Sequence, residues 1–203
     1  MNTVESVSVS SPARASGVRS IIYKVLTLAA IGAWTWSWFQ PWWEAYIETL
    51  QQNGVVIYPH QMLIAGTLRD YPQWIVGAEM PAFFFPLMWV YLAVCLGLLI
   101  FSLFDADEFT FAIGKLKMST TQALVGAAAI ALVTFVVVFP IVISLRAPQF
   151  HGVPLQGSVF ISMNEHTESY VITSLQTGYF VACGTAAFTA ALAFLRNLIV
   201  GKS

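Results

Sequence analysis

Four long apolar runs dominate the chain, and its ionisable side chains lie between these runs or near their ends. The runs are approximately Ile21 to Phe39, Ala82 to Phe104, Thr121 to Leu145 and Tyr170 to Val200. Each run can supply the roughly 20 helical residues that cross the hydrocarbon core of a bilayer. The pattern therefore predicts an all-α membrane protein with four transmembrane helices, the last of which tilts or projects at its start.

The first run has a second interpretation, because it follows arginines and contains the small residues Ala29 and Ala30, as a cleaved signal peptide would. However, the run continues into Trp34, Trp36 and Trp38, where a cleavage region should be small and polar. We therefore expect it to be retained as the first span. The predicted organisation is a cytoplasmic polar tail at 1–20 and a transmembrane domain at 21–203, with outer loops at approximately 40–81 and 146–169.

Lysines and arginines are distributed unevenly between the two sides that four spans would define. One side carries seven of them: Arg14, Arg19, Lys24, Lys115, Lys117, Arg196 and Lys202. The other side carries only Arg69 and Arg146. Because basic residues accumulate in cytoplasmic loops, this asymmetry predicts that both termini are cytoplasmic and that the two longer connections lie outside.

The start of the first outer loop has apolar residues at helical spacing. Trp43, Tyr46, Ile47 and Leu50 recur at i, i+3, i+4 and i+7, opposite Glu44, Glu48, Gln51 and Gln52. This spacing predicts an amphipathic helix lying along the membrane interface, ended at Asn53-Gly54. The segment from Val55 to Tyr58 has strand-like composition, and the rest of the loop is apolar enough to form a small ordered outer cap.

Aromatic and apolar residues near this boundary are predicted to anchor the protein at the membrane interface, because tryptophan combines an apolar ring with an N–H that needs a partner. The predicted anchors are Trp34, Trp38, Trp42, Trp43, Tyr46, Ile47 and Leu50. A stacking site for a ring-shaped ligand is the alternative interpretation.

Small residues at four-residue spacing occur in the third and fourth runs and predict close helix packing, since they let two backbones approach each other. They are Ala123, Ala127 and Ala131 in the third run and Gly178, Ala182, Ala186 and Ala190 in the fourth. Pro140 is expected to kink the third helix near its outer end, because it removes a backbone hydrogen bond.

The composition fits a lipid environment, with 58% hydrophobic residues, 9% charged residues and a mean hydropathy of +0.73. The net charge of -1 and the absence of a basic cluster argue against nucleic acid as a partner. Cys95 and Cys183 fall inside predicted helices, so no disulfide framework is expected in the outer loops.

The three histidines, His60, His151 and His166, all lie in the predicted outer loops. No histidine lies within a span, so haem ligation between transmembrane helices is not expected, and the spans lack the ionisable groups of an ion pathway. Cofactors are otherwise unknown. Five outer residues are candidate metal ligands: His60, His151, Glu165, His166 and Glu168. No nucleophile elbow or phosphate-binding glycine motif is present, so we expect no catalytic residues.

Four spans with a larger first and a smaller second outer loop are similar to claudin-like and tetraspan proteins in topology alone. The outer region contains no cysteine pair, and its tryptophan-rich start does not reproduce the claudin W-GLW-C-C pattern, so no family is identified. Neither Asn53 nor Asn164 begins a glycosylation motif, which favours a bacterial or archaeal inner membrane over a glycosylated eukaryotic surface.

These features lead to one functional prediction and two alternatives. The prediction is a non-catalytic subunit of a larger membrane complex, of respiratory, photosynthetic or membrane-oxygenase type, whose partners are membrane lipid and other integral membrane subunits. The first alternative is an enzyme subunit with an outer metal or quinone site formed by the loop His and Glu residues. The second is a self-associating tetraspan scaffold or channel.

Overall fold

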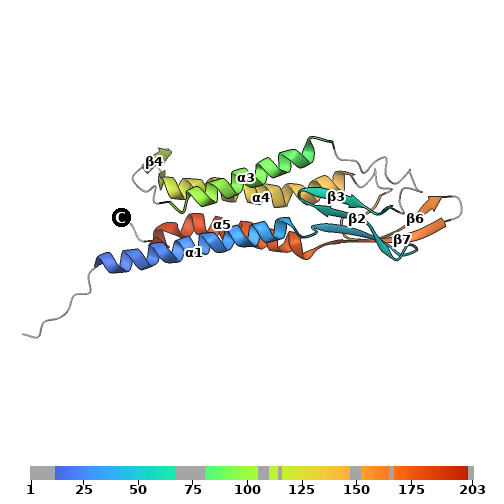
Figure 1. The fold of residues 1–203 in the computed structure, drawn as a ribbon, viewed down its shortest axis with the longest axis horizontal. Helices are drawn as coiled ribbons and strands as arrows, with labels where there is room; N and C mark the ends of the chain where they lie inside the picture. The colour runs from blue at the N-terminus through green and yellow to red at the C-terminus, as the bar shows by residue number, and fades with distance from the viewer. Residues whose placement is uncertain are drawn as a thin grey trace, which may run out of the picture.

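The protein is a bundle of long helices with an antiparallel sheet extending from one end (Figure 1). The computed structural model describes residues 12–66, 81–104, 110–113, 116–146, 152–164 and 167–200. The helices in this part of the chain are α1 (Pro12–Trp38), α3 (Phe84–Phe101), α4 (Thr120–Arg146) and α5 (Thr177–Val200). The tail predicted at 1–20 is thus described only from residue 12, where α1 begins.

In the part of the chain that the structure describes, four helices are long and apolar enough to cross a membrane, which confirms the predicted number of such helices. The qualifying segments are Gly17–Trp38, Phe84–Phe101, Thr120–Arg146 and Thr177–Arg196. The fourth apolar run does not remain helical at its start, because residues 170–175 belong to a strand and α5 begins at Thr177. The excess length of that run is therefore strand rather than a projecting helical turn.

The helices pack in the order α1, α5, α4, α3, with the closest association between α1 and α5 and between α4 and α5. Two clusters of buried side chains hold them together. The cluster nearer the sheet is aromatic and includes Trp34, Trp38 and Trp42. The other cluster is built around Tyr23, Leu99, Val125 and other apolar residues.

The prediction of an all-α fold is wrong, because the two longer connections between helices contribute to one five-stranded antiparallel sheet (Figure 1). Its order is β3-β2-β1-β7-β6. The strands are β1 (Trp43–Ile47), β2 (Gln52–Tyr58), β3 (Gln61–Ile64), β6 (Gly157–Asn164) and β7 (Thr167–Leu175). The first connection supplies β1 to β3, the second supplies β6 and β7, and the pairing of β1 with β7 joins them.

The predicted interfacial helix is also wrong, since its first five residues form β1. Trp43, Ala45 and Ile47 are buried in alternation with their neighbours, which is the two-residue period of a strand. Over five residues the apolar positions fit both a helix and a strand. The segment forms a strand because it pairs with β7, which is distant in the sequence. The chain reverses at Gln51, which adopts a positive φ of 51°, and not at Asn53-Gly54, which lies within β2.

A bulge in β2 marks the position of Gly54. Ala45 pairs with Val55 and Tyr46 pairs with Asn53, so Gly54 is the extra residue between them. Its carbonyl accepts a hydrogen bond from the backbone N–H of Ala65 (2.8 Å), which holds the end of the β3 hairpin against β2. The strand-like composition noted from Val55 to Tyr58 is confirmed by β2.

A second, two-stranded sheet lies at the far end of the bundle from the large one (Figure 1). It pairs β4 (Thr110–Ile113) with β5 (Leu116–Ser119), and β5 leads directly into α4. The C-terminus lies at this same end of the molecule. The bundle thus separates a small hairpin from the much larger five-stranded sheet.

The five-stranded sheet is joined to the bundle by very short connections. Only residues 39–42 separate α1 from β1, and only Gln176 separates β7 from α5. Because α1 packs on α5 and β1 pairs with β7, two helix-strand units lie side by side along much of the molecule. Gly178 fits this crossing closely, since a Cβ there would lie 2.5 Å from the carbonyl oxygen of Pro41.

Candidate functional site

The sheet has one buried face and one exposed face. On the buried side, Trp43, Ile57, Ile161 and Val171 pack with Ile143 of α4 and Val153. The indole N–H of Trp43 donates a hydrogen bond to the carbonyl of Leu155 (2.8 Å). Thr173 Oγ1 donates to the carbonyl of Pro154 (2.7 Å), so the segment around residues 153–156 is fixed over this face.

The exposed face carries a patch of large apolar side chains, which we call the outer patch: Tyr46, Phe160, Tyr170 and Ile172. Phe160 is directly opposite Tyr170, and their ring centroids lie 4.8 Å apart. Ile172 is opposite Tyr46 on one side and Ser158 on the other. The four side chains therefore form a contiguous surface across three strands and remain between 37% and 52% exposed.

Carboxylates surround the outer patch. The five strands contain Glu44 and Glu168 but no lysine or arginine, and exposed Glu48 follows β1. Glu168 pairs with Ser162, two residues along the strands from the Phe160–Tyr170 pair and on the same face. Glu44 lies two residues from Tyr46 on β1, at the opposite margin of the patch. The outer face thus combines an apolar centre with negative charge at its rim.

Most of the predicted interface anchors are buried inside the protein. Trp34, Trp38 and Trp42 are fully buried inside the bundle, and Trp43 and Ile47 belong to the buried face of the sheet. Tyr46 and Leu50 differ from these, with Tyr46 in the outer patch and Leu50 packed partly against the sheet core. The indole of Trp42 donates to the carbonyl of Ser37 (3.0 Å), so its polar group is satisfied within the protein.

His60 lies where the sheet meets the bundle. Its Nδ1 is 3.1 Å from the carbonyl oxygen of Trp38, and because a carbonyl can only accept, Nδ1 carries the proton of this hydrogen bond. The ring lies 5.2 Å from that of Trp89 and 5.5 Å from that of Phe39. Burial among these rings lowers the pKa of His60, although the Trp38 carbonyl opposes that shift.

The structure describes only some of the candidate metal ligands. His151, Glu165 and His166 lie outside the described residues, whereas His60 and Glu168 lie within them. Leu175 is opposite Trp43 and marks the end of β7 that is nearest the bundle. Glu168 is seven residues earlier in the same strand and lies toward the far end of the sheet. At about 3.3 Å per residue, these two positions are roughly 23 Å apart along the sheet.

His60 is at the bundle end of the sheet and Glu168 is at its far end. Among the described residues, no group of three or more His, Cys, Asp and Glu side chains is arranged to hold a metal ion. The outer metal site remains a prediction, and it would have to omit either His60 or Glu168.

The small residues predicted to pack helices occupy different environments. On α5, Ala182 and Ala186 are buried and Ala190 is partly buried. Gly178 meets the residues that connect α1 to β1. On α4 the buried positions include Ala128 and Leu132, whereas Ala127 is exposed and Ala123 and Ala131 are intermediate.

Pro140 leaves a backbone carbonyl of α4 without its usual donor. In a regular helix the N–H of residue 140 would bond the carbonyl of Val136, and proline has no N–H. The hydroxyl of Tyr179, on α5, donates a hydrogen bond to this Val136 oxygen (3.1 Å). α4 remains continuous through Pro140, and a side chain from the neighbouring helix replaces the missing bond.

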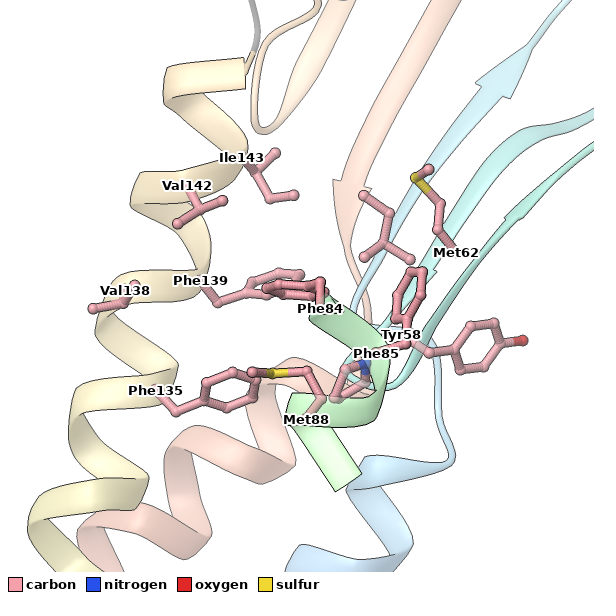
Figure 2. A pocket seen from close by; sticks show the side chains of 12 residues that line it. Tyr58, Met62, Phe84, Phe85, Met88, Phe135, Val138, Phe139, Val142 and Ile143 are labelled. Carbon is pink, nitrogen blue, oxygen red and sulfur yellow. The ribbon is translucent and has the colours of Figure 1, made fainter. Parts of the chain in front are cut away.

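An apolar cavity of about 180 Å³ lies near this proline, between α3, α4 and the β2–β3 hairpin (Figure 2). It is lined by Ile57, Tyr58, Pro59, Met62, Phe84, Phe85, Met88, Phe135, Val138, Phe139, Val142 and Ile143. Figure 2 shows the hydroxyl of Tyr58 pointing away from α4, so hydrocarbon dominates the lining. Such a cavity can hold an apolar group but offers no acid or base for chemistry.

Neither the outer patch nor the cavity was predicted from the sequence. The outer patch did have a signal, because Phe160, Tyr170 and Ile172 alternate with other residues at a period of two, as exposed strand positions do. The cavity had none, since its walls come from three separate parts of the chain. No protein family, curated protein or solved structure matches this chain.

Proposed function

We propose that this protein is a non-catalytic integral membrane subunit that binds a different, basic protein through the outer patch. The observation that carries the proposal is the contiguous apolar surface of Tyr46, Phe160, Tyr170 and Ile172 on the exposed face of the sheet. Single exposed apolar residues are ordinary on protein surfaces, whereas contiguous patches with a polar rim are typical of protein interaction sites.

The position of the outer patch supports a protein partner rather than lipid. The sheet extends beyond the ends of the four helices that are long enough to span a membrane (Figure 1). With those helices in the bilayer, the exposed face of β6 and β7 lies in water. Lipid would then cover the helices but not Phe160 and Tyr170.

The charge of the sheet favours a different protein over a second copy. Glu44, Glu48 and Glu168 lie around the outer patch, and the strands provide no lysine or arginine to neutralise carboxylates brought by an identical face. Like charges placed across an interface cost several kcal/mol, whereas complementary charges speed association and fix its geometry. The partner expected here has an apolar contact surface flanked by lysine or arginine.

The same proposal places both termini in the cytoplasm and the five-stranded sheet outside. It is supported by the seven basic residues on the side of the termini and the β4–β5 hairpin, against two on the other side. The partner would therefore act at the outer surface of the membrane, with this chain as its anchored neighbour.

The test uses the tagged full-length chain, extracted from its native membrane in a mild detergent. Zero-length coupling of carboxylates to amines, followed by mass spectrometry, should join Glu168 to a lysine of a stoichiometric partner. Replacing both Phe160→Ser and Tyr170→Ser should release that partner, and moderate salt should weaken its binding.

Leu63→Ser is the matched control, because Leu63 is also an exposed apolar residue of this sheet but lies on the edge strand β3. It should retain the partner. Retention of the same partner by the Phe160→Ser, Tyr170→Ser variant would contradict the proposal, as would purification of copies of this chain alone cross-linked through β6 and β7.

A further inference from the structure

We propose that the cavity between α3, α4 and the β2–β3 hairpin binds the end of one hydrocarbon chain of a bilayer glycerolipid. The inference uses the membrane placement proposed above but does not depend on a protein partner. Its first support is chemical, because the walls are formed by aliphatic and aromatic side chains, with the Tyr58 hydroxyl directed away (Figure 2). An apolar occupant is favoured, since water requires two or more polar partners.

The size of the cavity limits the occupant to part of a lipid. Its volume is about 180 Å³, slightly larger than an engineered apolar cavity of about 150 Å³ that stays free of water and binds benzene. A space of this size accommodates a short segment of an acyl chain but not a whole lipid. We therefore infer that the chain end enters while the rest of the lipid remains in the bilayer.

The arrangement of the walls provides access from the lipid side. Val138 is 42% exposed and lies on α4 among other outward-facing apolar residues, including Val137 and Ile141. Ile57 and Ile143 line the cavity and are almost fully buried. The cavity thus connects the exposed surface of α4 with the buried junction between the bundle and the sheet.

The depth of the opening also fits a hydrocarbon chain. α4 contains 27 residues, or about 40 Å of helix at 1.5 Å per residue, whereas the hydrocarbon core is about 30 Å thick. Val138 is eight residues before Arg146, which places it about 12 Å along the helix from that end. The opening therefore lies within reach of acyl chains and below the level of lipid head groups.

Two methionines make the cavity adaptable. Met88 comes from α3 and Met62 from β3, so they line it from separate elements (Figure 2). Their unbranched, flexible side chains can adjust to occupants of different shape. With no charged group in the lining, the site should bind saturated and monounsaturated chains alike and should not select a head group.

The experiment labels the full-length protein in lipid nanodiscs with phosphatidylethanolamine that carries a photoreactive diazirine near the end of one acyl chain. After illumination and digestion, mass spectrometry should find adducts concentrated on the cavity-facing residues of α4 and on the β2–β3 hairpin. Val138→Trp should remove these adducts by filling the opening. Val137→Trp adds the same bulk to a neighbouring exposed position outside the lining and should retain them.

If Val138→Trp fails to fold, Val142→Phe fills the same cavity from one turn further along α4 and should give the same loss. Equal labelling in the filled and control variants would overturn the proposal. Adducts spread evenly over the exposed surface of α4 would do the same. So would a stoichiometric isoprenoid quinone, extracted from native membranes, that protects the cavity from acyl-chain labelling. Partner binding is measured separately, so loss of the docking proposal leaves this test unchanged.

Discussion

The hydrogen bond from Tyr179 to Val136 gives the sharpest test of how this bundle tolerates Pro140. Tyr179→Phe removes the hydroxyl that reaches the Val136 carbonyl at 3.1 Å and keeps the aromatic ring. The carbonyl then has neither this donor nor a helical N–H at position 140. A hydrogen bond between membrane helices contributes roughly 0.6 to 2 kcal/mol, so we expect the free energy of unfolding to fall by about 1 to 2 kcal/mol.

Pro140→Ala supplies the missing N–H and should make the Tyr179 hydroxyl nearly dispensable. In that background, Tyr179→Phe should lower the free energy of unfolding by about 0.5 kcal/mol or less, giving a coupling energy of about 1 kcal/mol. The assay is reversible unfolding in mixed micelles, followed by tryptophan fluorescence. Tyr46→Phe is the control for the same chemical change at an exposed residue and should have little effect. Equal losses in both backgrounds would refute the explanation.

Three further outcomes are expected. Because burial lowers the pKa of His60, the unfolded chain takes up its proton first as pH falls through about 6.5; His60→Gln should therefore reduce the loss of melting temperature between pH 7.5 and 5, and an unchanged pH profile would exclude His60 as its source. Gly178→Ala should destabilise the protein by about 1 to 3 kcal/mol in the same unfolding assay, because the added methyl meets backbone; a neutral result would mean that the α1–β1 connection moves aside. Ala186→Leu should cost about 1 to 3 kcal/mol by overpacking, while Ala187→Leu on the exposed side should be neutral; similar effects would contradict the orientation of α5.

The helices were predictable because their signal is local. A run such as Thr121 to Leu145 is apolar over about 20 residues, and no distant contact is needed to recognise it as a potential span. The face of this helix that is buried was harder to predict, because alanine and valine face lipid as readily as protein in such a run. Ala127 is exposed although its spacing suggested a packing face.

The sheet was not predictable because it depends on pairing across most of the chain. Trp43 pairs with Ile57 and with Leu175, and the second of these is 132 residues away. Over five residues, helical and alternating patterns both fit, so the local sequence could not exclude a helix. The short strand-like segment from Val55 to Tyr58 was identified only because β-branched and aromatic residues are concentrated there.

The environment of the tryptophans was also not predictable from the local sequence. Interface anchoring and burial between helices both favour an apolar ring, and the sequence of one helix does not say what lies against it. Trp34 and Trp38 meet Phe135 of α4, a contact that depends on how two helices far apart in the sequence pack. The candidate outer patch likewise required knowledge of which face of β7 is covered.

The short connections from α1 to β1 and from β7 to α5 fix how far the outer patch stands from the helix bundle. Tyr170 is five residues before Leu175, the last residue of β7 and the one at the bundle end, so it stands about 16 Å beyond that end of the sheet. If the proposed partner binds there, a partner confined to the bilayer could not reach Tyr170, and the partner would need a domain or long loop of similar height. The strands continue the helices almost directly. A change in membrane thickness that tilts α1 and α5 would therefore also change the orientation of the outer patch.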